Sequence, residues 1–539
     1  MRILIVSFLS ALFSGKWSVI TMGMHWKQAS PSSDFGVRRP NIVIITCDSF
    51  DGRLTFYPGN TTVALPFVNF MNSYGANFLN AYTNSPICCP SRAALWSGLF
   101  AHLTESWNNY KCLEKDYPTW MDVLKQHGYL TQMFGKLDYT SGHHSLSNRV
   151  EAWTRDVEFL LRQEGRPVAE VTGNQTTVRV MEKDWQNTDS ASCWLRHAAV
   201  SQTQPFALYL GLNLPHPYPT PTMGEDFGSS TFLTSPYWLK KVSYDAVTIP
   251  TWLHLSDFHP VDYYSSYTKN CTSNFTEQEI RDIRAHYYAM CAETDAMLGE
   301  ILSTLAETGL LQNTVIIFTS DHGELAMEHR QFYKMSMYEG SSHIPFIMMG
   351  PNIKGGQQIS SLVSLVDVYP TLLDISGIPL SKNLSGFSLL PLLSQRSQEE
   401  TTPEKEHPDW IFSEFHGSDV NASTYMLRIG KWKYITYGDG YSMPAQLFDL
   451  SSDPDELKNM AAAFPDIRDA MDKKLHLIVN YTAVSTSVHQ YNKQQFISWK
   501  ESLGQNYSTV IANLRWHRDW QNDPQKYEHD IEMWLKGKS

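Results

Sequence analysis

The sequence predicts an α/β fold in which helices flank a large central, mostly parallel sheet, followed by a smaller C-terminal α+β domain with a short antiparallel sheet. Two apolar runs, at residues 41–46 and 315–320, are rich in β-branched residues, which is typical of central strands buried on both faces. Asp48 and Asp321 follow these runs closely. Ligands of open parallel sheets bind beyond the carboxyl ends of the strands, so we expect both carboxylates at one site.

Local patterns predict the other elements. Residues 205–212 are a third strand candidate, and apolar residues at helical spacing predict a long amphipathic helix over residues 280–305. A polar, charged tract at residues 392–409 predicts a linker. Beyond it, three short runs predict the antiparallel sheet, and a fourth segment predicts a strand, a turn and a capped helix. These four segments are residues 410–415, 425–428, 431–437 and 447–457.

The chain divides into three predicted parts. Arg2 followed by a short apolar run predicts a secretory signal peptide over residues 1–22. We expect a large domain over residues 38–395 and a C-terminal subdomain over residues 408–539. The chain has 539 residues, 42% of them hydrophobic, which suffices for a sizeable core. No later stretch approaches the ~20 apolar residues that span a bilayer, so we expect no membrane span.

Charge and sequons narrow the class of protein. The net charge of −12 at pH 7 argues against a nucleic-acid-binding protein, because such proteins usually carry a basic field. Eight Asn-x-Ser/Thr sequons favour the secretory pathway. The candidate glycosylation sites are Asn60, Asn174, Asn270, Asn274, Asn383, Asn421, Asn480 and Asn506.

The segment Cys-Cys-Pro-Ser-Arg at residues 88–92 is the most informative motif. Pro90, followed by Ala and Leu, predicts the first turn of a helix, with Cys88 just outside its N-terminus. The helix dipole, the unpaired N–H groups and Arg92 would together hold a sulfate or phosphate ester there. The alternative is that Cys88 and Cys89 are structural thiols or disulfide partners, as is common in secreted chains.

The seven cysteines do not define a pairing. An odd number leaves one thiol over, which a secreted protein tolerates poorly unless that thiol is converted or reactive. Cys271 and Cys291 are a possible local disulfide, and Cys47 lies in a probable core strand. The connectivity stays open at this point.

Cys-x-Pro-Ser-Arg, continued by Ala-Ala-Leu-Trp-Ser-Gly, resembles the signature of the type I sulfatases, whose fold is an alkaline phosphatase-like sandwich. In that family a formylglycine-generating enzyme oxidises the first cysteine, here Cys88, to formylglycine (3-oxoalanine) in the endoplasmic reticulum. The aldehyde hydrates to a geminal diol, one oxygen of which attacks the sulfur of a sulfate ester. Conversion of Cys88 would leave an even set of six cysteines.

The resemblance also implies one calcium ion per chain. Asp48, Cys88, Asp321 and His322 match the positions that surround the metal in the family. This sequence departs from the common pattern at Ser49, where many sulfatases have a second Asp, and at His322, where many have Asn. Imidazole is a poor partner for calcium, so the sequence leaves the metal open.

Three basic side chains would meet the sulfate. Arg92 lies in the signature, Lys136 matches the lysine of a Gly-Lys-Trp-His segment, and Lys334 matches a lysine that precedes Tyr-Glu-Gly. Asp138 replaces the histidine of the first of these segments, which puts the activation of formylglycine in doubt. His143 and His144 lie close by in sequence and could substitute.

Two histidines are candidates for protonating the leaving oxygen and contacting substrate. His216, in Asn-Leu-Pro-His-Pro, matches the family's substrate-side histidine, and His259, in Phe-His-Pro-Val-Asp, is a second candidate. Either imidazole could instead be a hydrogen-bonded structural group.

The resemblance covers nearly the whole mature chain and is strongest to family members that act on 2-sulfated glucuronate in glycosaminoglycans. It implies a sulfuric ester hydrolase, also active on aryl sulfates, that reaches the lysosome through the endoplasmic reticulum. A mannose 6-phosphate receptor is the candidate partner for this delivery, and secretion of the protein is also expected. One alternative is a phosphatase or phosphodiesterase of the same superfamily. Another is a non-catalytic secreted glycosaminoglycan-binding protein, which the departures at Ser49 and Asp138 keep open and the intact Cys88 motif opposes.

Overall fold

A computed structural model describes residues 39–142, 165–219, 229–380, 383–393, 407–417, 423–512 and 523–537. The predicted signal peptide, His143, His144, Asn421 and most of the predicted linker lie outside the described residues. Residues 36–539 form one compact unit, and the boundary between the two predicted domains stays a prediction. Within the described ranges, no helix is long and apolar enough to cross a membrane.

The large sheet is mostly parallel, as predicted. It has seven strands in the order β10-β2-β9-β8-β1-β5-β3. Strand β1 lies between β5 and β8 and runs parallel to both, whereas β9 is antiparallel to its two neighbours. The bounds are β1 Asn41–Asp48, β2 Ala76–Tyr82, β3 Leu130–Gly135, β5 Phe206–Pro215, β8 Thr314–Ser320, β9 Phe346–Met349 and β10 Gln357–Ser364.

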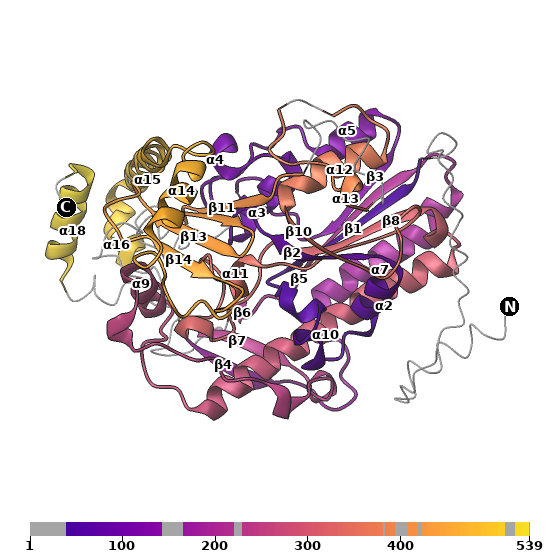
Figure 1. The fold of residues 1–539 in the computed structure, drawn as a ribbon, viewed down its shortest axis with the longest axis horizontal. Coiled ribbons are helices and arrows are strands. Elements are labelled where there is room, and N and C mark those ends of the chain that lie inside the picture. The colour runs from indigo at the N-terminus through magenta and orange to yellow at the C-terminus, as the bar shows by residue number, and fades with distance from the viewer. Residues whose placement is uncertain are drawn as a thin grey trace. The chain divides into compact units, whose positions relative to one another are not determined.

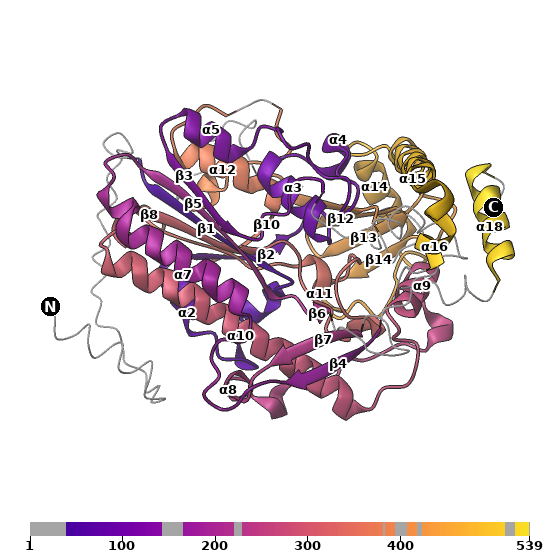
Figure 2. The same ribbon diagram turned by 180° about the vertical axis from the view of Figure 1, so that it is seen from behind.

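Helices cover both faces of this sheet, which explains why β1 and β8 are buried along their whole length (Figures 1 and 2). One face of β1, with Ile42 and Ile44, packs in a cluster with Trp96, Trp120 and Leu372 from the helices above it. The other face is covered by α7 and by α10, the long amphipathic helix that the sequence predicts. These helices are α3 Cys88–Ser97, α5 Trp120–Gln126, α7 Glu182–His197, α10 Glu277–Glu307 and α12 Val368–Ile375.

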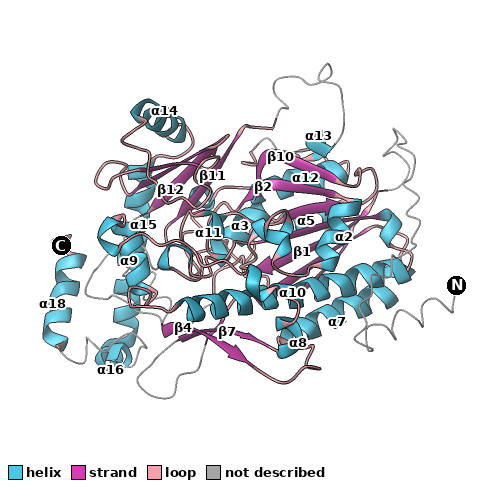
Figure 3. Ribbon diagram, turned by 60° about the horizontal axis from the view of Figure 1, so that its bottom comes forward, coloured by secondary structure: helices cyan, strands magenta, loops and turns pink. Residues whose placement is uncertain are grey.

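The antiparallel C-terminal sheet also forms as predicted and has four strands in chain order. Figure 3 labels the first two of these strands. These are β11 Trp410–Phe415, β12 Thr424–Ile429, β13 Trp432–Tyr437 and β14 Gln446–Asp449. Helices α14 (Pro465–Leu475), α15 (Tyr481–Leu503), α16 (Tyr507–Ala512) and α18 (Pro524–Leu535) follow this sheet in the chain.

The capped helix predicted within residues 447–457 is wrong. The strand and the turn form, but the Asp453 carboxylate accepts the amides of Leu457 and Lys458, and no helix begins before Pro465. Glu456 has a left-handed backbone, with φ of 53°, and its carboxylate lies 2.7 Å from Nζ of the buried Lys433. This ion pair joins residues that lie outside one local pattern. It holds Glu456 in a non-helical conformation, although the local sequence predicts a helix there.

A third, three-stranded sheet was not predicted from the sequence. Its order is β4-β7-β6, and it lies beside α10 (Figure 2). The bounds are β4 Gly165–Val171, β6 Tyr218–Pro219 and β7 Ser229–Thr234, and the short helix α9 (Pro260–Thr268) precedes α10.

Candidate active site

The carboxyl ends of β1 and β8 bring together the four side chains that the sequence groups around a metal. The two strands pair in parallel register up to Cys47 and Ser320, so Asp48 and Asp321 emerge at the same edge of the sheet. Helix α3 begins at this edge. One ligand atom from each member of the group lies within 4.8 Å of the others, and all four side chains are buried. The group is Asp48, Cys88, Asp321 and His322.

Cys88 is the first residue of α3, with Ile87 as its N-cap, so the helix begins one residue earlier than predicted. Its Sγ lies 3.6 Å from Asp48 Oδ2 and 3.4 Å from His322 Nε2. Burial, and then the charge of Asp48, raises the pKa of the thiol to about 12. The unmodified side chain is therefore a protonated thiol and a poor nucleophile.

The neighbouring cysteine forms a disulfide. Cys89 bonds to Cys112. Cys271 and Cys291 are both free thiols, so the possible pairing of these two is wrong. Cys271 instead donates a hydrogen bond to the Lys269 carbonyl at 3.3 Å. The free thiols are Cys47, Cys88, Cys193, Cys271 and Cys291.

Arg92, one turn along α3, is fully buried and ties the helix to the site. Its Nε donates to Asp321 Oδ2 at 2.8 Å, and its Nη1 donates to the Lys136 carbonyl at 2.9 Å and to Tyr209 Oη at 3.1 Å. Its Nη2 lies 3.7 Å from Asp48 Oδ2 and has no hydrogen-bond partner among the described residues. One buried donor of the guanidinium is therefore left for an anion.

Lys136 follows β3 and contacts the Asp48 carboxylate through Nζ. Burial alone would raise the pKa of Asp48, but Lys136, His216 and His322 hold it well below its usual range, so this carboxylate is ionised. Asp138, which stands where the family has histidine, is buried with a left-handed backbone and lies 3.7 Å from Lys136 Nζ. It adds a carboxylate beside the lysine rather than an imidazole beside Cys88.

His216 and Lys334 also lie at the site, and Nζ of Lys334 contacts Nε2 of His216. The His216 Nδ1 lies 2.7 Å from the Pro217 carbonyl, which can only accept, so Nδ1 carries the proton and Nε2 is the acceptor. Burial and the charge of Lys334 hold the pKa of His216 well below its usual value. The ring of Tyr333 lies 5.4 Å from that of His216.

Asp184 is a buried residue that sequence reasoning missed. Its carboxylate, on α7, accepts the amides of Asn213 at 2.7 Å and Leu214 at 2.8 Å. These contacts fix the end of β5 that carries His216. No local pattern in the sequence links residue 184 to residue 216.

His259 is not brought into the cluster by any described contact. Its Nδ1 accepts the Val261 amide at 3.2 Å, its Nε2 donates to the Pro444 carbonyl at 2.8 Å, and its ring stacks on Tyr437 at 4.5 Å. These partners belong to α9 and the C-terminal sheet. Its catalytic or substrate-contact role stays a prediction.

The chemistry of the four-residue group fits a cation. The His322 Nδ1 lies 3.0 Å from the Gly323 carbonyl and therefore carries the proton, so the Nε2 lone pair faces the two carboxylates at 3.5 Å. Ser49, with φ of 72°, turns its Oγ to 3.1 Å from Asp48 Oδ1. Two carboxylates, one imidazole nitrogen and the side chain of residue 88 surround the site.

The segment that carries Lys334 has an unusual backbone. Six of its non-glycine residues have positive φ, which costs about 1–3 kcal/mol each, so surrounding contacts must hold the segment in place. These residues are Ala326, Met327, His329, Arg330, Tyr333 and Met335.

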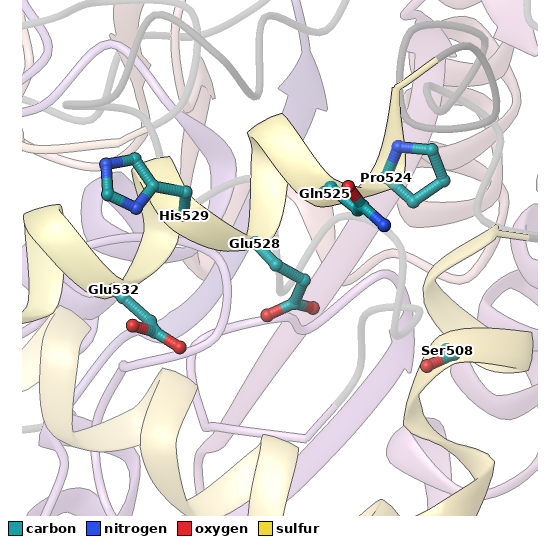
Figure 4. Close-up of a pocket in the computed structure, with 6 residues that line it drawn as sticks. All are labelled: Ser508, Pro524, Gln525, Glu528, His529 and Glu532. Carbon is teal, nitrogen blue, oxygen red and sulfur yellow. The ribbon is translucent and has the colours of Figure 1, made fainter.

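A separate hollow of about 400 Å³ lies between α16 and α18 (Figure 4). Glu528, His529 and Glu532 line it, and Glu528 pairs with Lys500 at 2.8 Å. Its acidic lining does not suit an anionic substrate.

Comparison with known proteins identifies the class to which this site belongs. Residues 40–378 match the sulfatase family, and residues 327–480 match the C-terminal region of N-sulphoglucosamine sulphohydrolase. The chain belongs to the sulfatase family, and its reaction is the hydrolysis of a sulfate ester.

Within the family, the chain is similar to proteins named arylsulfatase K. It is 68% identical to that of Gallus gallus over 507 residues, which are 94% of this chain and 95% of the relative. It is also 68% identical to that of Homo sapiens over 499 residues, 93% of each chain.

Solved structures share the fold at lower identity. A phosphonate monoester hydrolase from Silicibacter pomeroyi has a TM-score of 0.64 at 20% identity, covering 82% of this chain and 96% of that one. A structure described as a 2-O GAG sulfatase has a TM-score of 0.62 at 23% identity, covering 84% and 94%. These likenesses support the alkaline phosphatase-like architecture.

Proposed function

We propose that this protein removes the 2-O-sulfate of glucuronate from glycosaminoglycan sugars, and that formylglycine made from Cys88 is its nucleophile. The observation that carries the proposal is the position of Cys88 at the start of α3, beside two buried carboxylates and Nη2 of Arg92, which makes no hydrogen bond to any described residue. The arylsulfatase K relatives at 68% identity support the reaction class. The described 2-O GAG sulfatase shares the fold and is consistent with the sugar preference.

Formylglycine at position 88 would supply an oxygen nucleophile that the protonated thiol does not. We propose Ca²⁺ as the metal, held by Asp48, Asp321, His322 and residue 88, where it would draw negative charge from the sulfate. The carboxylates are the hard ligands that calcium prefers, whereas His322 gives the site an imidazole in place of one oxygen donor.

The remaining chemistry is performed by the side chains of the chain itself. Nη2 of Arg92, Nζ of Lys136 and Nζ of Lys334 are positioned to neutralise the sulfate oxygens in a buried site, where such charges act strongly.

His216 is the proposed proton donor to the leaving oxygen. In the free protein, Lys334 lowers the proton affinity of the imidazole. A sulfate bound beside Lys334 cancels that charge, so Nε2 gains proton affinity when substrate is present. Nε2 would then hold the proton that the departing alkoxide needs, while the Pro217 carbonyl keeps the ring oriented through Nδ1.

We also propose that the protein travels through the endoplasmic reticulum to the lysosome and is partly secreted, after conversion by a formylglycine-generating enzyme. A mannose 6-phosphate receptor would deliver it. All seven described sequon asparagines are exposed or half-buried, which is compatible with glycan attachment. These are Asn60, Asn174, Asn270, Asn274, Asn383, Asn480 and Asn506.

Mass spectrometry of the tryptic peptide that contains Cys88, from protein secreted by eukaryotic cells, tests the nucleophile. A mass loss corresponding to conversion of thiol to aldehyde is expected. The same protein should release sulfate from 2-O-sulfated glucuronate and from an aryl sulfate at acidic pH, and Cys88→Ala should abolish both activities. An unmodified cysteine without turnover would instead favour a glycosaminoglycan-binding protein, and turnover of phosphate diesters alone would favour a phosphodiesterase.

A further inference from the structure

The strained segment at residues 326–335 presents Lys334 to the site, and its neighbours hold it there. The Tyr333 amide donates to Glu324 Oε1 at 2.5 Å, and the Tyr333 carbonyl accepts the Leu325 amide at 2.8 Å. On the other side, the Met335 amide donates to the Pro86 carbonyl at 3.0 Å. The main chain is therefore fixed immediately before and after Lys334.

Lys269 contacts Lys334 itself. This lysine is the C-cap of α9 and is completely buried. Its Nζ donates to the Lys334 carbonyl at 2.5 Å and to Oε1 of the buried Gln331 at 2.9 Å. A buried ammonium is costly unless its hydrogen bonds are made, so these contacts join the segment firmly to α9.

We infer that Lys269 is a positioning residue for the reaction, which holds the Lys334 ammonium against His216 through the Lys334 carbonyl. The inference rests on the proposed sulfate contact of Lys334. Lys269 does not itself contact the four-residue group around Cys88 in any described interaction. Its contact with the Lys334 carbonyl fixes the backbone position from which the Lys334 side chain reaches Nε2 of His216.

Glu324 is the second anchor of the same segment. Its Oε1 also accepts the Ala326 amide at 3.1 Å, so one oxygen spans the segment from its first residue to Tyr333. Glu324→Gln keeps an acceptor oxygen, whereas Glu324→Leu removes it. The two variants therefore separate the acceptor from the charge.

The test compares Lys269→Met with Lys433→Met as a matched control. Lys433 is also completely buried, but its ammonium pairs with Glu339 and Glu456 between the large domain and the C-terminal sheet. Both variants should lose thermal stability. Lys269→Met should in addition weaken the binding of inorganic sulfate and lower kcat/KM for an aryl sulfate, each about tenfold or more, whereas folded Lys433→Met should keep both values.

A double-mutant cycle shows whether Lys269 acts through Lys334. The variant Lys269→Met/Lys334→Ala should have the kcat/KM of Lys334→Ala, within about twofold, because the lost carbonyl contact no longer has an ammonium to position. Independent, additive losses would overturn the inference. Unchanged sulfate affinity in Lys269→Met, with lower stability alone, would show a structural role and also overturn it.

Three further variants keep the test decisive. If Lys269→Met does not fold, Lys269→Gln replaces it, since glutamine retains a donor to the carbonyl and should show a smaller loss of sulfate affinity. Separately, Glu324→Leu should lose more sulfate affinity than Glu324→Gln. Equal values for Glu324→Leu and Glu324→Gln would count against the inference. Calorimetry measures sulfate affinity, so it tests the role of Lys269 even if the wild-type protein hydrolyses no ester. The absence of ester hydrolysis would overturn the proposed function instead.

Discussion

Oδ2 of Asp321 lies 2.8 Å from Nε of Arg92, and both side chains are completely buried. Asp321 follows β8 in the large sheet, whereas Arg92 belongs to α3, whose first residue is Cys88. This ion pair therefore sets the distance between the helix that carries the proposed nucleophile and the strand that carries the proposed metal ligands. A buried pair is costly to break, because the remaining charge is left without compensation.

Arg92→Gln should accordingly lower the free energy of unfolding by about 3–5 kcal/mol and lower kcat/KM at least about hundredfold. The control is Arg196→Gln, which breaks a pair with Glu307 at 3.1 Å on the exposed surface of α7 and should cost about 1 kcal/mol or less. Urea unfolding and aryl sulfate kinetics measure the two quantities. Equal effects of both substitutions would contradict the special role of Arg92.

Removal of the metal should affect both activity and binding. Incubation with EGTA should abolish turnover, and Ca²⁺ should restore it, because Asp48 and Asp321 supply hard oxygen ligands. His322→Asn should raise the Ca²⁺ affinity of the apoprotein, since an amide oxygen replaces the imidazole nitrogen. Calorimetric titration with CaCl₂ measures the affinity directly. Restoration by Zn²⁺ but not by Ca²⁺ would show that the imidazole selects a softer metal.

Three buried carboxyl groups should make the protein more stable in acid. Burial raises the pKa of Glu293, Asp295 and Glu324 to about 7 in each case. Between their unfolded pKa values, near 4, and pH 7, the folded state binds more protons than the unfolded state. Each group thus lowers the free energy of unfolding by up to about 1.4 kcal/mol per pH unit as the pH rises through this range.

Urea unfolding at pH 5.0 and 7.5 should show the higher stability at pH 5.0. Asp295→Asn is the informative variant, because it removes one titrating group and keeps one of the two oxygens that accept the amides of Phe67 and Val68. The difference between the two pH values should shrink in this variant. A wild-type protein that is more stable at pH 7.5 would contradict the assignment.

The two histidines beside Glu414 should stabilise the folded protein within a limited range of pH. Oε1 of Glu414 lies 2.9 Å from His102 Nδ1, and Oε2 lies 3.1 Å from His416 Nε2. Burial opposes the charges of Glu414 and His102. The attraction between these two groups nevertheless lowers the pKa of Glu414 to about 2 and raises the pKa of His102 above its usual value. The contribution of Glu414 to the free energy of unfolding is complete above about pH 4.5 and is lost as the pH falls towards 2. The contribution of His102 is complete below about pH 6.5 and is lost as the pH rises through the raised pKa of this histidine.

Glu414→Gln should therefore destabilise the protein most at about pH 5–6, by about 3 kcal/mol, as the lowered pKa of Glu414 indicates. The loss should be smaller once the pH has risen above the raised pKa of His102. Thermal unfolding across this range gives the comparison. A constant loss at all pH values would show that the ion pair contributes nothing beyond its hydrogen bonds.

The sequence predicts those parts of the molecule whose signature is local. Strands β1 and β8 are buried on both faces and so consist of unbroken apolar runs, and the acids at their ends follow from chain direction. By contrast, β4 and β7 are far apart in the chain and pair beside α10, with Gly165 opposite Ser229 and Val171 opposite Thr234, and they leave no comparable pattern. Their arrangement depends on the folded neighbours.

The same distinction holds at the site. The residues of the motif around Cys88 can be recognised from the sequence itself. By contrast, Asp184 acts on His216, and Lys269 on Lys334, through backbone groups. Every residue type has a backbone carbonyl, and every type except proline has a backbone N–H. The sequence of the contacted segment therefore does not reveal which residue anchors it. The Cys89–Cys112 disulfide is likewise a property of three-dimensional proximity.

The burial of Cys88, whose exposed fraction is 3%, imposes an order of events on biosynthesis. An enzyme that modifies this side chain must hold it in its own active site, which the folded chain does not permit. The proposed conversion must therefore be finished while the polypeptide is still extended, before α3 closes onto the strand ends. The share of active molecules in any preparation is then decided during synthesis, and a folded batch with unconverted cysteine cannot be rescued by later treatment.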